Sequence, residues 1–141
     1  AAVLLLSDLE EAKKKSIEPL AKIVSWASVG VEPSLMGLGP IGAVKQAIKK
    51  ADWKLEDIDL FEINEAFAAQ CIAVIRELNI DEDKVNVNGG AIALGHPFGM
   101  TGARIMTTLI NGLEDTDKEF GLETMCVGGG QGMAMIVQRM S

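Results

Sequence analysis

The chain has 141 residues, of which 48% are hydrophobic and 23% charged, a composition typical of one globular domain with a buried core. Its net charge of −7, with no basic stripe, argues against nucleic acid or an anionic membrane as a partner. Two cysteines are too few for a disulfide scaffold, so we expect a reducing compartment, by default the cytoplasm. No apolar run approaches the roughly 18 residues of a membrane span.

Hydrophobic periodicity predicts alternating strands and helices along the chain. In chain order we expect strand 2–6, helix 8–15, strand 20–27, helix 40–51, strand 59–63, helix 65–78, strand 85–87, helix 101–113 and strands 122–127 and 133–139. Ser7 is predicted to cap the first helix, with Glu10 closing a capping box. The elements together predict a single α/β domain over residues 1–141, with a mixed five-stranded sheet and helices on both faces.

The only histidine, His96, lies between Gly95 and Pro97 at a predicted strand-to-helix junction. In open α/β sheets, ligands bind in the crevice at the carboxyl ends of the strands. A neutral imidazole there can donate a hydrogen bond to a developing oxyanion, while its other nitrogen fixes the tautomer. The alternative is a structural histidine bonded to a backbone carbonyl.

Cys126 is followed by three glycines, Gly128–Gly130, which are predicted to form a hairpin turn. Glycines let the backbone approach a ligand, so that their N–H groups can face an oxyanion. A thiol beside such donors has a lowered pKa and acts as a nucleophile or base. The alternative is a small buried hydrophobic residue, which is how we interpret Cys71 on its predicted helix.

Asn64 and Glu65 lie between a predicted strand and a predicted helix. Taken alone, they are best explained as an N-cap and as a carboxylate suited to the helix dipole. Metal binding is not expected, because one histidine and two cysteines at these separations match no ligand spacing.

Three phrases taken together resemble the thiolases: Asn64-Glu65-Ala66-Phe67, Gly95-His96-Pro97, and Cys126-x-Gly128-Gly129-Gly130. The stretch 86–97 is similar to a nearly complete thiolase signature, and the resemblance to the acetoacetyl-CoA type extends over the whole chain. One stretch departs from the pattern. Residues 98–102 read Phe-Gly-Met-Thr-Gly, where the family commonly has Ile-Gly-Ala-Ser-Gly, so Thr101 keeps the hydroxyl.

The resemblance implies a Claisen condensation of two acetyl-CoA to acetoacetyl-CoA, and the reverse thiolysis, with coenzyme A thioesters as substrates and no further cofactor. Cys126 would be the acid/base. His96 would donate to a thioester oxyanion and help to activate a nucleophilic cysteine, while Asn64 would hold a water that completes this oxyanion hole. The Gly128 N–H would serve a second oxyanion hole. The residues expected to border a short acyl pocket are Met36, Ala66 and Phe67.

The family carries its nucleophilic cysteine in an N-terminal half that nothing in this chain matches. The chain starts inside a predicted strand and has no initiator methionine, so we expect it to be a C-terminal half that is inactive alone. Its expected partners are an acyl-CoA substrate, the N-terminal half, and further copies in a homodimer or homotetramer. Two alternatives remain: a degradative 3-ketoacyl-CoA thiolase, and a non-catalytic thiolase-like binding module.

Overall fold

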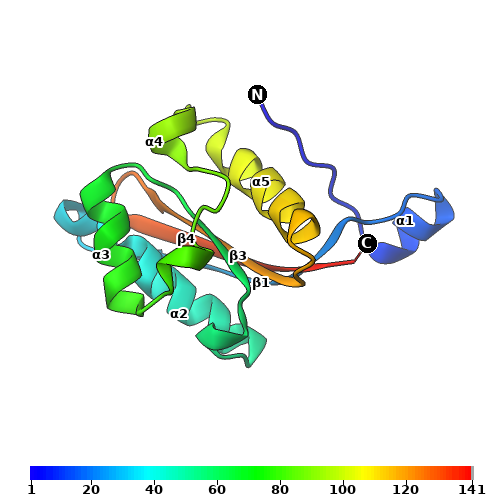
Figure 1. Ribbon diagram of the computed structural model, residues 1–141, viewed down its shortest axis with the longest axis horizontal. Helices are drawn as coiled ribbons and strands as arrows, with labels where there is room; N and C mark the ends of the chain where they lie inside the picture. Colours follow the sequence, from blue (N-terminus) through cyan, green and yellow to red (C-terminus); the bar gives the residue numbers. More distant parts are fainter. Residues whose placement is uncertain (141) are drawn as a thin grey trace.

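The centre of the protein is a mixed sheet of four strands, one fewer than predicted (Figure 1). The structure is a computed structural model that describes residues 1–140. Its strands are β1 (Ala21–Gly30), β2 (Leu60–Ile63), β3 (Phe120–Val127) and β4 (Gln131–Arg139). They lie in the order β1-β4-β3-β2, with β4 antiparallel to both of its neighbours and β2 parallel to β3.

Of the six strand segments predicted along the chain, two are absent from this sheet. Residues 2–6 form no strand, and their apolar side chains stay exposed, with Val3 at 89% and Leu5 at 80%. Of residues 85–87, only Val85 pairs, as an isolated bridge to Phe61. The next residue, Asn86, has a φ of 48°, which turns the chain away from the sheet before a second pair can form.

The first helix, α1 (Leu9–Lys14), begins one residue later than predicted. Asp8, rather than Ser7, is its N-cap: the carboxylate of Asp8 accepts a hydrogen bond of 2.8 Å from the Glu11 backbone N–H. A carboxylate at this position also complements the positive end of the helix dipole.

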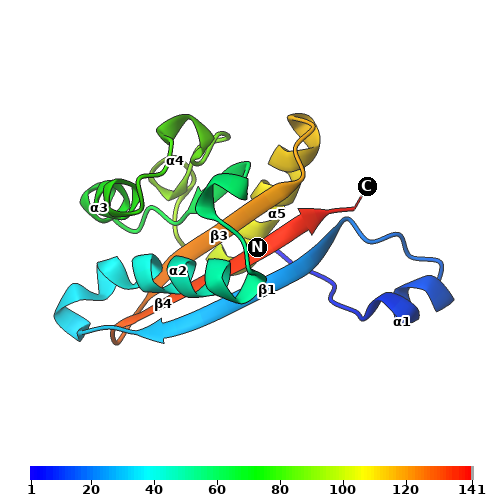
Figure 2. The same cartoon turned by 90° about the horizontal axis from the view of Figure 1, so that it is seen from below.

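Helices cover both faces of the sheet, as predicted. On one face lies α2 (Gly39–Ala51), and on the other α5 (Thr101–Asp115), so that Figure 2 shows α2 in front of the strands and α5 behind them. The helix α3 (Ala68–Leu78) lies on the α2 side. The remaining helical segments are short: η1 (Pro33–Leu38), η2 (Leu55–Asp57), η3 (Glu82–Lys84) and α4 (Ala91–Leu94). None of the helices in residues 1–140 is both long and apolar enough to span a membrane.

The core is divided by the sheet into two clusters. The larger one packs residues of α2 and α3, such as Val44 and Val74, against Leu122 and Ile136 of the sheet. The approach of α2 is very close at Gly39, where an added Cβ would lie 2.5 Å from the Gln131 carbonyl oxygen. Any larger residue at this position would push the helix off the sheet.

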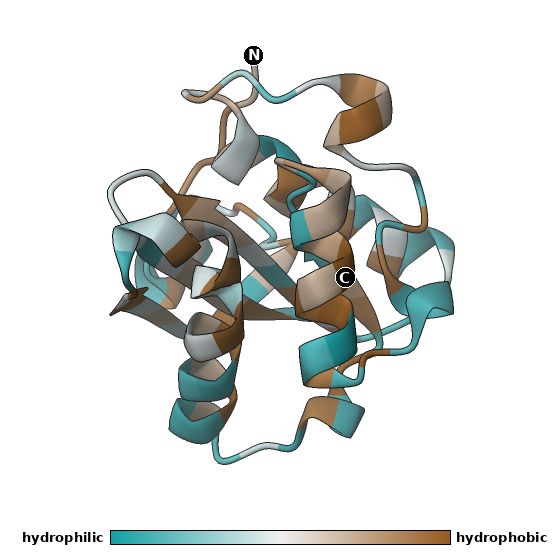
Figure 3. Cartoon of the chain, turned by 90° about the vertical axis from the view of Figure 1, so that its left-hand side faces the viewer, coloured by the Kyte–Doolittle hydropathy of each residue, from teal (hydrophilic) through white to brown (hydrophobic). Residues whose placement is uncertain are grey.

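The smaller cluster lies under α5 and leaves apolar side chains of the same sheet face exposed. Met106 and Leu109 of α5 pack on Val137 of β4. Further toward the edge, Trp26 of β1 pairs with Met135 of β4, and Trp26 remains 60% exposed. Figure 3 colours much of the sheet brown, in keeping with these apolar strands. A contiguous apolar face of this kind is typical of a surface that another polypeptide covers.

We expect the isolated chain to self-associate through this face, because burial of the exposed side chains of Trp26 and Met133 lowers the free energy. Light scattering after size exclusion would then report a mass above 15.0 kDa. The variant Trp26→Lys should shift the mass toward the monomer. The matched control Ile72→Lys, an exposed apolar residue on α3, should not. A monodisperse wild-type monomer would contradict the expectation.

Candidate active site

The predicted site residues Asn64 and Cys126 come together at one edge of the sheet. Asn64 directly follows β2, and its backbone N–H donates a hydrogen bond of 2.9 Å to the Thr124 carbonyl of β3. Cys126 lies two residues further along β3. Since β2 and β3 are parallel, their carboxyl ends meet, and this edge is where α/β sheets place ligands.

His96 joins this edge through a chain of short polar contacts. The Asn64 side-chain nitrogen Nδ2 lies 3.3 Å from His96 Nε2. On the other side of the ring, His96 Nδ1 lies 2.6 Å from the hydroxyl oxygen of Thr101, which itself donates to the Pro97 carbonyl at 3.2 Å. Asn64 and Thr101 are completely buried, so they hold the half-buried ring from both sides.

The neighbours of the ring are consistent with a neutral tautomer that carries its proton on Nδ1. A hydroxyl has one proton, and when Thr101 donates it to the Pro97 carbonyl, the hydroxyl oxygen accepts from Nδ1. In this tautomer Nε2 keeps its lone pair, which faces the Asn64 amide and can take up a proton.

Asn64 is not the cap of the following helix. The N-cap position of α3 is held by Phe67, without a side-chain hydrogen bond, and α3 begins at Ala68 rather than at Glu65 as predicted. The Asn64 side-chain oxygen Oδ1 is buried and has no hydrogen-bond partner among the described residues. A buried acceptor without a partner costs free energy, and a group bound at the site can satisfy it.

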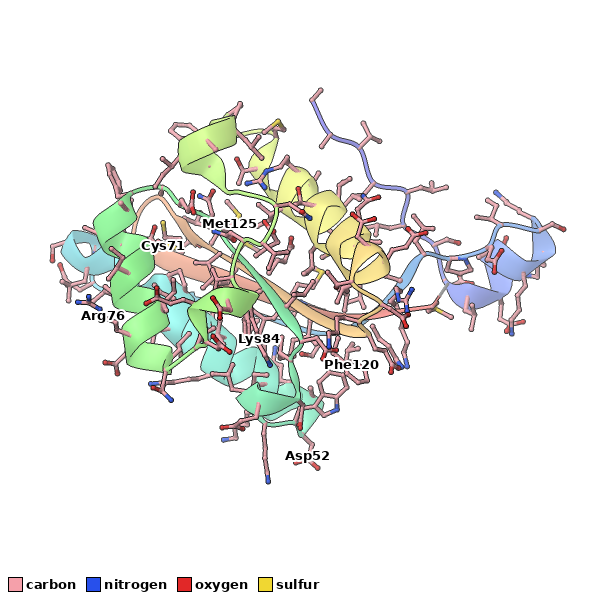
Figure 4. All side chains as sticks on the ribbon, viewed as in Figure 1. Asp52, Cys71, Arg76, Lys84, Phe120 and Met125 are labelled. Carbon is pink, nitrogen blue, oxygen red and sulfur yellow. The ribbon has the colours of Figure 1, made fainter. Side chains whose placement is uncertain are left out.

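Cys126 is buried in β3, with 6% of its surface exposed. Burial raises the pKa of its thiol, a direction opposite to the lowered pKa that the glycine turn predicted. The thiol is therefore protonated at neutral pH, and its thiolate, once formed, is a strong base. Cys71, the other cysteine, lies on the inner side of α3, where burial raises the pKa to about 11, in agreement with a core role (Figure 4).

The three glycines between β3 and β4 differ in their surroundings: two need glycine for their backbone conformation, and one has open space beside its backbone. Gly129 and Gly130 have φ values of 86° and 88°, which favour glycine, and an added Cβ at Gly130 would lie 2.4 Å from the Val31 carbonyl oxygen. Gly128 differs, because it is exposed and an added Cβ would meet nothing within 4 Å. The backbone at Gly128 is thus accessible to a ligand.

The residues predicted to border an acyl pocket lie on two neighbouring segments. Met36, on η1, is half-buried, and Ala66 and Phe67 connect β2 to α3, against which η1 packs. Phe67 is 64% exposed. A shallow hollow lies elsewhere, at the amino end of β3, and is lined by Trp53, Asp57, Asp59, Asp117, Lys118, Glu119 and Phe120. Figure 4 shows Phe120 at the far end of the sheet from Met125, so this acidic hollow is separate from the site.

A cluster of two glutamates and an arginine, not predicted from the sequence, lies along the two strands that carry Asn64 and Cys126. Glu62 of β2 and Glu123 of β3 are paired in register, and Arg104 of α5 lies 3.4 Å from the Glu62 carboxylate. Burial raises the pKa of Glu62 to about 7 and that of Glu123 to about 8. The signal in the sequence was a glutamate inside each of two apolar strands.

In residues 1–140, no group of three His, Cys, Asp or Glu side chains is arranged to hold a metal ion.

The raised pKa of Glu123 makes stability depend on pH. The ordinary value is 4.5 and the folded value is about 8, so between them the folded protein binds a proton that the unfolded chain releases. Stability therefore falls as the pH rises through this window. We expect Glu123→Gln to remove much of this loss of stability at high pH. The Tm near pH 9 should rise by on the order of 5 °C, and the Tm near pH 5 should rise less.

Differential scanning fluorimetry over this pH range tests the expectation. The matched control is Glu56→Gln, a substitution of the same kind at an exposed position on η2. The difference in Tm between Glu56→Gln and the wild type should not change with pH. A Glu123→Gln profile parallel to that of the wild type would show that Glu123 ionises normally in the folded protein.

Comparisons with known proteins agree on one family. Residues 17–139 match the family model described as "Thiolase, C-terminal domain". Mouse cytosolic acetyl-CoA acetyltransferase is 55% identical over 139 residues, 99% of this chain and 35% of that protein. Acetyl-CoA acetyltransferase of Escherichia coli K12 is 52% identical over 141 residues, which cover 100% of this chain and 36% of that protein.

Solved structures agree with these relatives. The Bacillus anthracis acetyl-CoA acetyltransferase superimposes with a TM-score of 0.91 at 51% identity, covering 94% of this chain and 34% of that one. Human mitochondrial 3-ketoacyl-CoA thiolase in complex with CoA gives 0.92 at 47% identity, over 94% and 34% of the two chains. The present chain thus spans about a third of the length of the proteins it matches.

Proposed function

This chain belongs to the thiolase family, and we propose that it acts as the C-terminal domain of an acetyl-CoA acetyltransferase. Such an enzyme condenses two acetyl-CoA molecules to acetoacetyl-CoA and catalyses the reverse thiolysis. The observation that carries the proposal is the contact chain from Asn64 through His96 to Thr101, at the sheet edge that also bears Cys126. Relatives named acetyl-CoA acetyltransferase at 52–55% identity support this substrate class.

His96 performs two steps in the proposed mechanism. Its Nε2 lone pair takes the proton of a cysteine thiol that the remainder of the enzyme supplies, and the thiolate then attacks the acetyl carbonyl of the first acetyl-CoA. The C–S bond to CoA breaks as Cys126 gives its thiol proton to the departing CoA sulfur, which leaves an acetyl-cysteine and a Cys126 thiolate. With its proton gained, His96 donates from Nε2 to the carbonyl oxygen of the second thioester, together with a water held by the Asn64 amide.

Cys126 moves the proton that makes the carbon–carbon bond possible. As a thiolate, it takes a proton from the methyl group of the second acetyl-CoA, and the resulting enolate attacks the carbonyl carbon of the acetyl-cysteine. The Gly128 N–H donates to the oxyanion formed there, and the nucleophilic cysteine leaves and takes back its proton from His96 as acetoacetyl-CoA is released. Met36, Ala66 and Phe67 border the short acyl group. Only protons and an acyl group move, so the chemistry calls for no cofactor besides the CoA thioesters.

The remainder of the enzyme supplies what this chain lacks in the proposal. With a net charge of −7, the chain is a poor cradle for CoA phosphates, which we assign to an N-terminal part together with the nucleophile. The exposed sheet face around Trp26 is suited to contact that part. We further propose a homodimer or homotetramer, as the family resemblance implies, and a location in the cytoplasm, by analogy with the cytosolic mouse relative.

A chimera tests the proposal. In the E. coli acetyl-CoA acetyltransferase, the region that matches this chain is replaced by residues 1–141. We expect thiolysis of acetoacetyl-CoA by the purified chimera, and none by the chain alone. A folded chimera without activity would contradict the proposal and favour a non-catalytic module. A preference for longer 3-ketoacyl-CoA substrates would favour the degradative alternative, which the likeness to human mitochondrial 3-ketoacyl-CoA thiolase motivates.

A further inference from the structure

The side chain of Asn86 pairs with the backbone at the end of β2 as a neighbouring strand would. Its oxygen Oδ1 accepts a hydrogen bond of 2.8 Å from the Ile63 N–H, and its nitrogen Nδ2 donates at 2.9 Å to the Ile63 carbonyl. The Asn86 backbone N–H also donates to the Phe61 carbonyl at 2.8 Å. Asn86 is buried, at 9% exposure, and it therefore fixes the residue that directly precedes Asn64.

Glu65, the residue after Asn64, extends this arrangement toward His96. Its carboxylate oxygen Oε1 accepts from Asn86 Nδ2 at 3.1 Å, and its other oxygen, Oε2, accepts from the Ile92 N–H at 3.0 Å. Ile92 lies in α4, the short helix that leads to His96. The expectation that Glu65 complements the dipole of the following helix is wrong, because its carboxylate faces a different segment of the chain.

Gly90 makes room for this carboxylate. An added Cβ at Gly90 would lie 2.3 Å from the carboxyl carbon of Glu65. The backbone of Gly90, with φ −112° and ψ −161°, is extended and open to any residue. Glycine is therefore required here by the position of Glu65 and not by the backbone conformation.

We infer that Glu65 and Asn86 form a positioning clamp that holds Asn64 and His96 at their working separation. The inference rests on the proposed function, since it concerns how that site is assembled. The clamp fixes the chain on both sides of Asn64, at Ile63 and Glu65, and joins it to the segment that carries His96. The Asn64–His96 contact of 3.3 Å is thereby set by residues that touch neither substrate nor reacting atoms.

The Glu65→Gln variant of the chimera tests the clamp, because both carboxylate oxygens act as acceptors. The amide nitrogen of glutamine would face one of two donors, so that one contact becomes repulsive. Small displacements of catalytic groups cost on the order of 10²-fold in rate, so we expect kcat to fall by roughly 10- to 100-fold. Because the displaced groups act on the chemical step, KM for acetoacetyl-CoA should change less than about threefold.

The matched control is Glu77→Gln, the same substitution at an exposed position on α3. It should keep kcat within about twofold of the parent. A purely structural role for Glu65 would lower the Tm and leave kcat unchanged at temperatures well below the transition.

A double-variant cycle with Gly90 gives a second, independent measurement. We expect Gly90→Ala to lower kcat to a similar extent as Glu65→Ala, because its methyl group displaces the carboxylate. In the Glu65→Ala background the space is free, so Gly90→Ala should cost little more. If Glu65→Gln does not fold, this cycle decides the matter.

Full kcat in a folded Glu65→Gln chimera, or additive effects in the cycle, would overturn the inference. An inactive parent chimera would instead count against the proposed function. In that case, amide hydrogen exchange at Ile63 and Ile92, measured in the chain itself, tests the clamp. Glu65→Gln should accelerate exchange at these amides, whereas exchange unchanged from the wild type would overturn the clamp.

Discussion

Replacing Cys126 by alanine in the chimera is expected to lower kcat for acetoacetyl-CoA thiolysis by on the order of 10³-fold, the usual contribution of a general acid/base. The thiol is buried, its pKa is raised, and it lies at the sheet edge shared with Asn64. Removal of Sγ leaves no group to exchange a proton with the carbon of the acyl group. Steady-state kinetics with acetoacetyl-CoA and CoA measure the loss.

The chain offers a matched control in its second cysteine. Cys71 is equally buried, at 6% exposure, but packs in the core from α3. Cys71→Ala removes the same atom and should reduce stability slightly while keeping kcat within about twofold. If Cys126→Ala retained a comparable kcat, Cys126 would be a core residue like Cys71, and the assigned base would be wrong.

The second large effect is expected for His96→Asn. The substitution removes Nε2, which is the proton acceptor in the neutral ring and the oxyanion donor once protonated. Loss of one oxyanion-hole donor costs roughly 10²- to 10³-fold in kcat. The nucleophilic cysteine would also lose its base, so alkylation of that cysteine by iodoacetamide near pH 7 should slow in parallel.

The two readouts separate the two roles of His96. An alkylation rate equal to that of the parent, with kcat reduced, would remove the role in activating the nucleophile and keep the role in the oxyanion hole. Thr101→Ser provides the conservative control, because it retains the hydroxyl that contacts Nδ1, and it should keep both rates within about threefold. Unchanged kcat in His96→Asn would contradict the proposed site altogether.

Much of the fold could be predicted because it depends on local spacing. Apolar residues every three or four positions predicted α2, α3 and α5, and the glycine turn predicted the hairpin of β3 and β4. The predictions of strands at 2–6 and 85–87 were wrong for the same reason. A strand needs a partner for its backbone, and neither apolar residues at positions 3–6 nor Val85 and Val87 reveal whether one is present.

The candidate site was predictable only as a set of residue types. Asn64, His96 and Cys126 were identified from their motifs, and the structure places Asn64 against His96 and Cys126 at the same sheet edge. The predicted lowering of the Cys126 pKa was wrong, because burial of the thiol raises this pKa. Glu65 and Asn86 were missed as partners, because their hydrogen bond joins residues 21 positions apart.

The sequence by itself determined which groups are available: one imidazole, two thiols, a glycine turn, and helices and strands whose apolar periods require a two-sided α/β sheet. Only the tertiary structure decided the neighbours of His96, the pairing of Arg104 with Glu62, and the hydrogen bond between Glu65 and Asn86. The physical reason is one of range. Periodicity acts over a few residues, whereas burial and hydrogen-bond geometry arise from contacts such as Asn64–His96, 32 positions apart, and Arg104–Glu62, 42 apart, which exist only once the chain has folded.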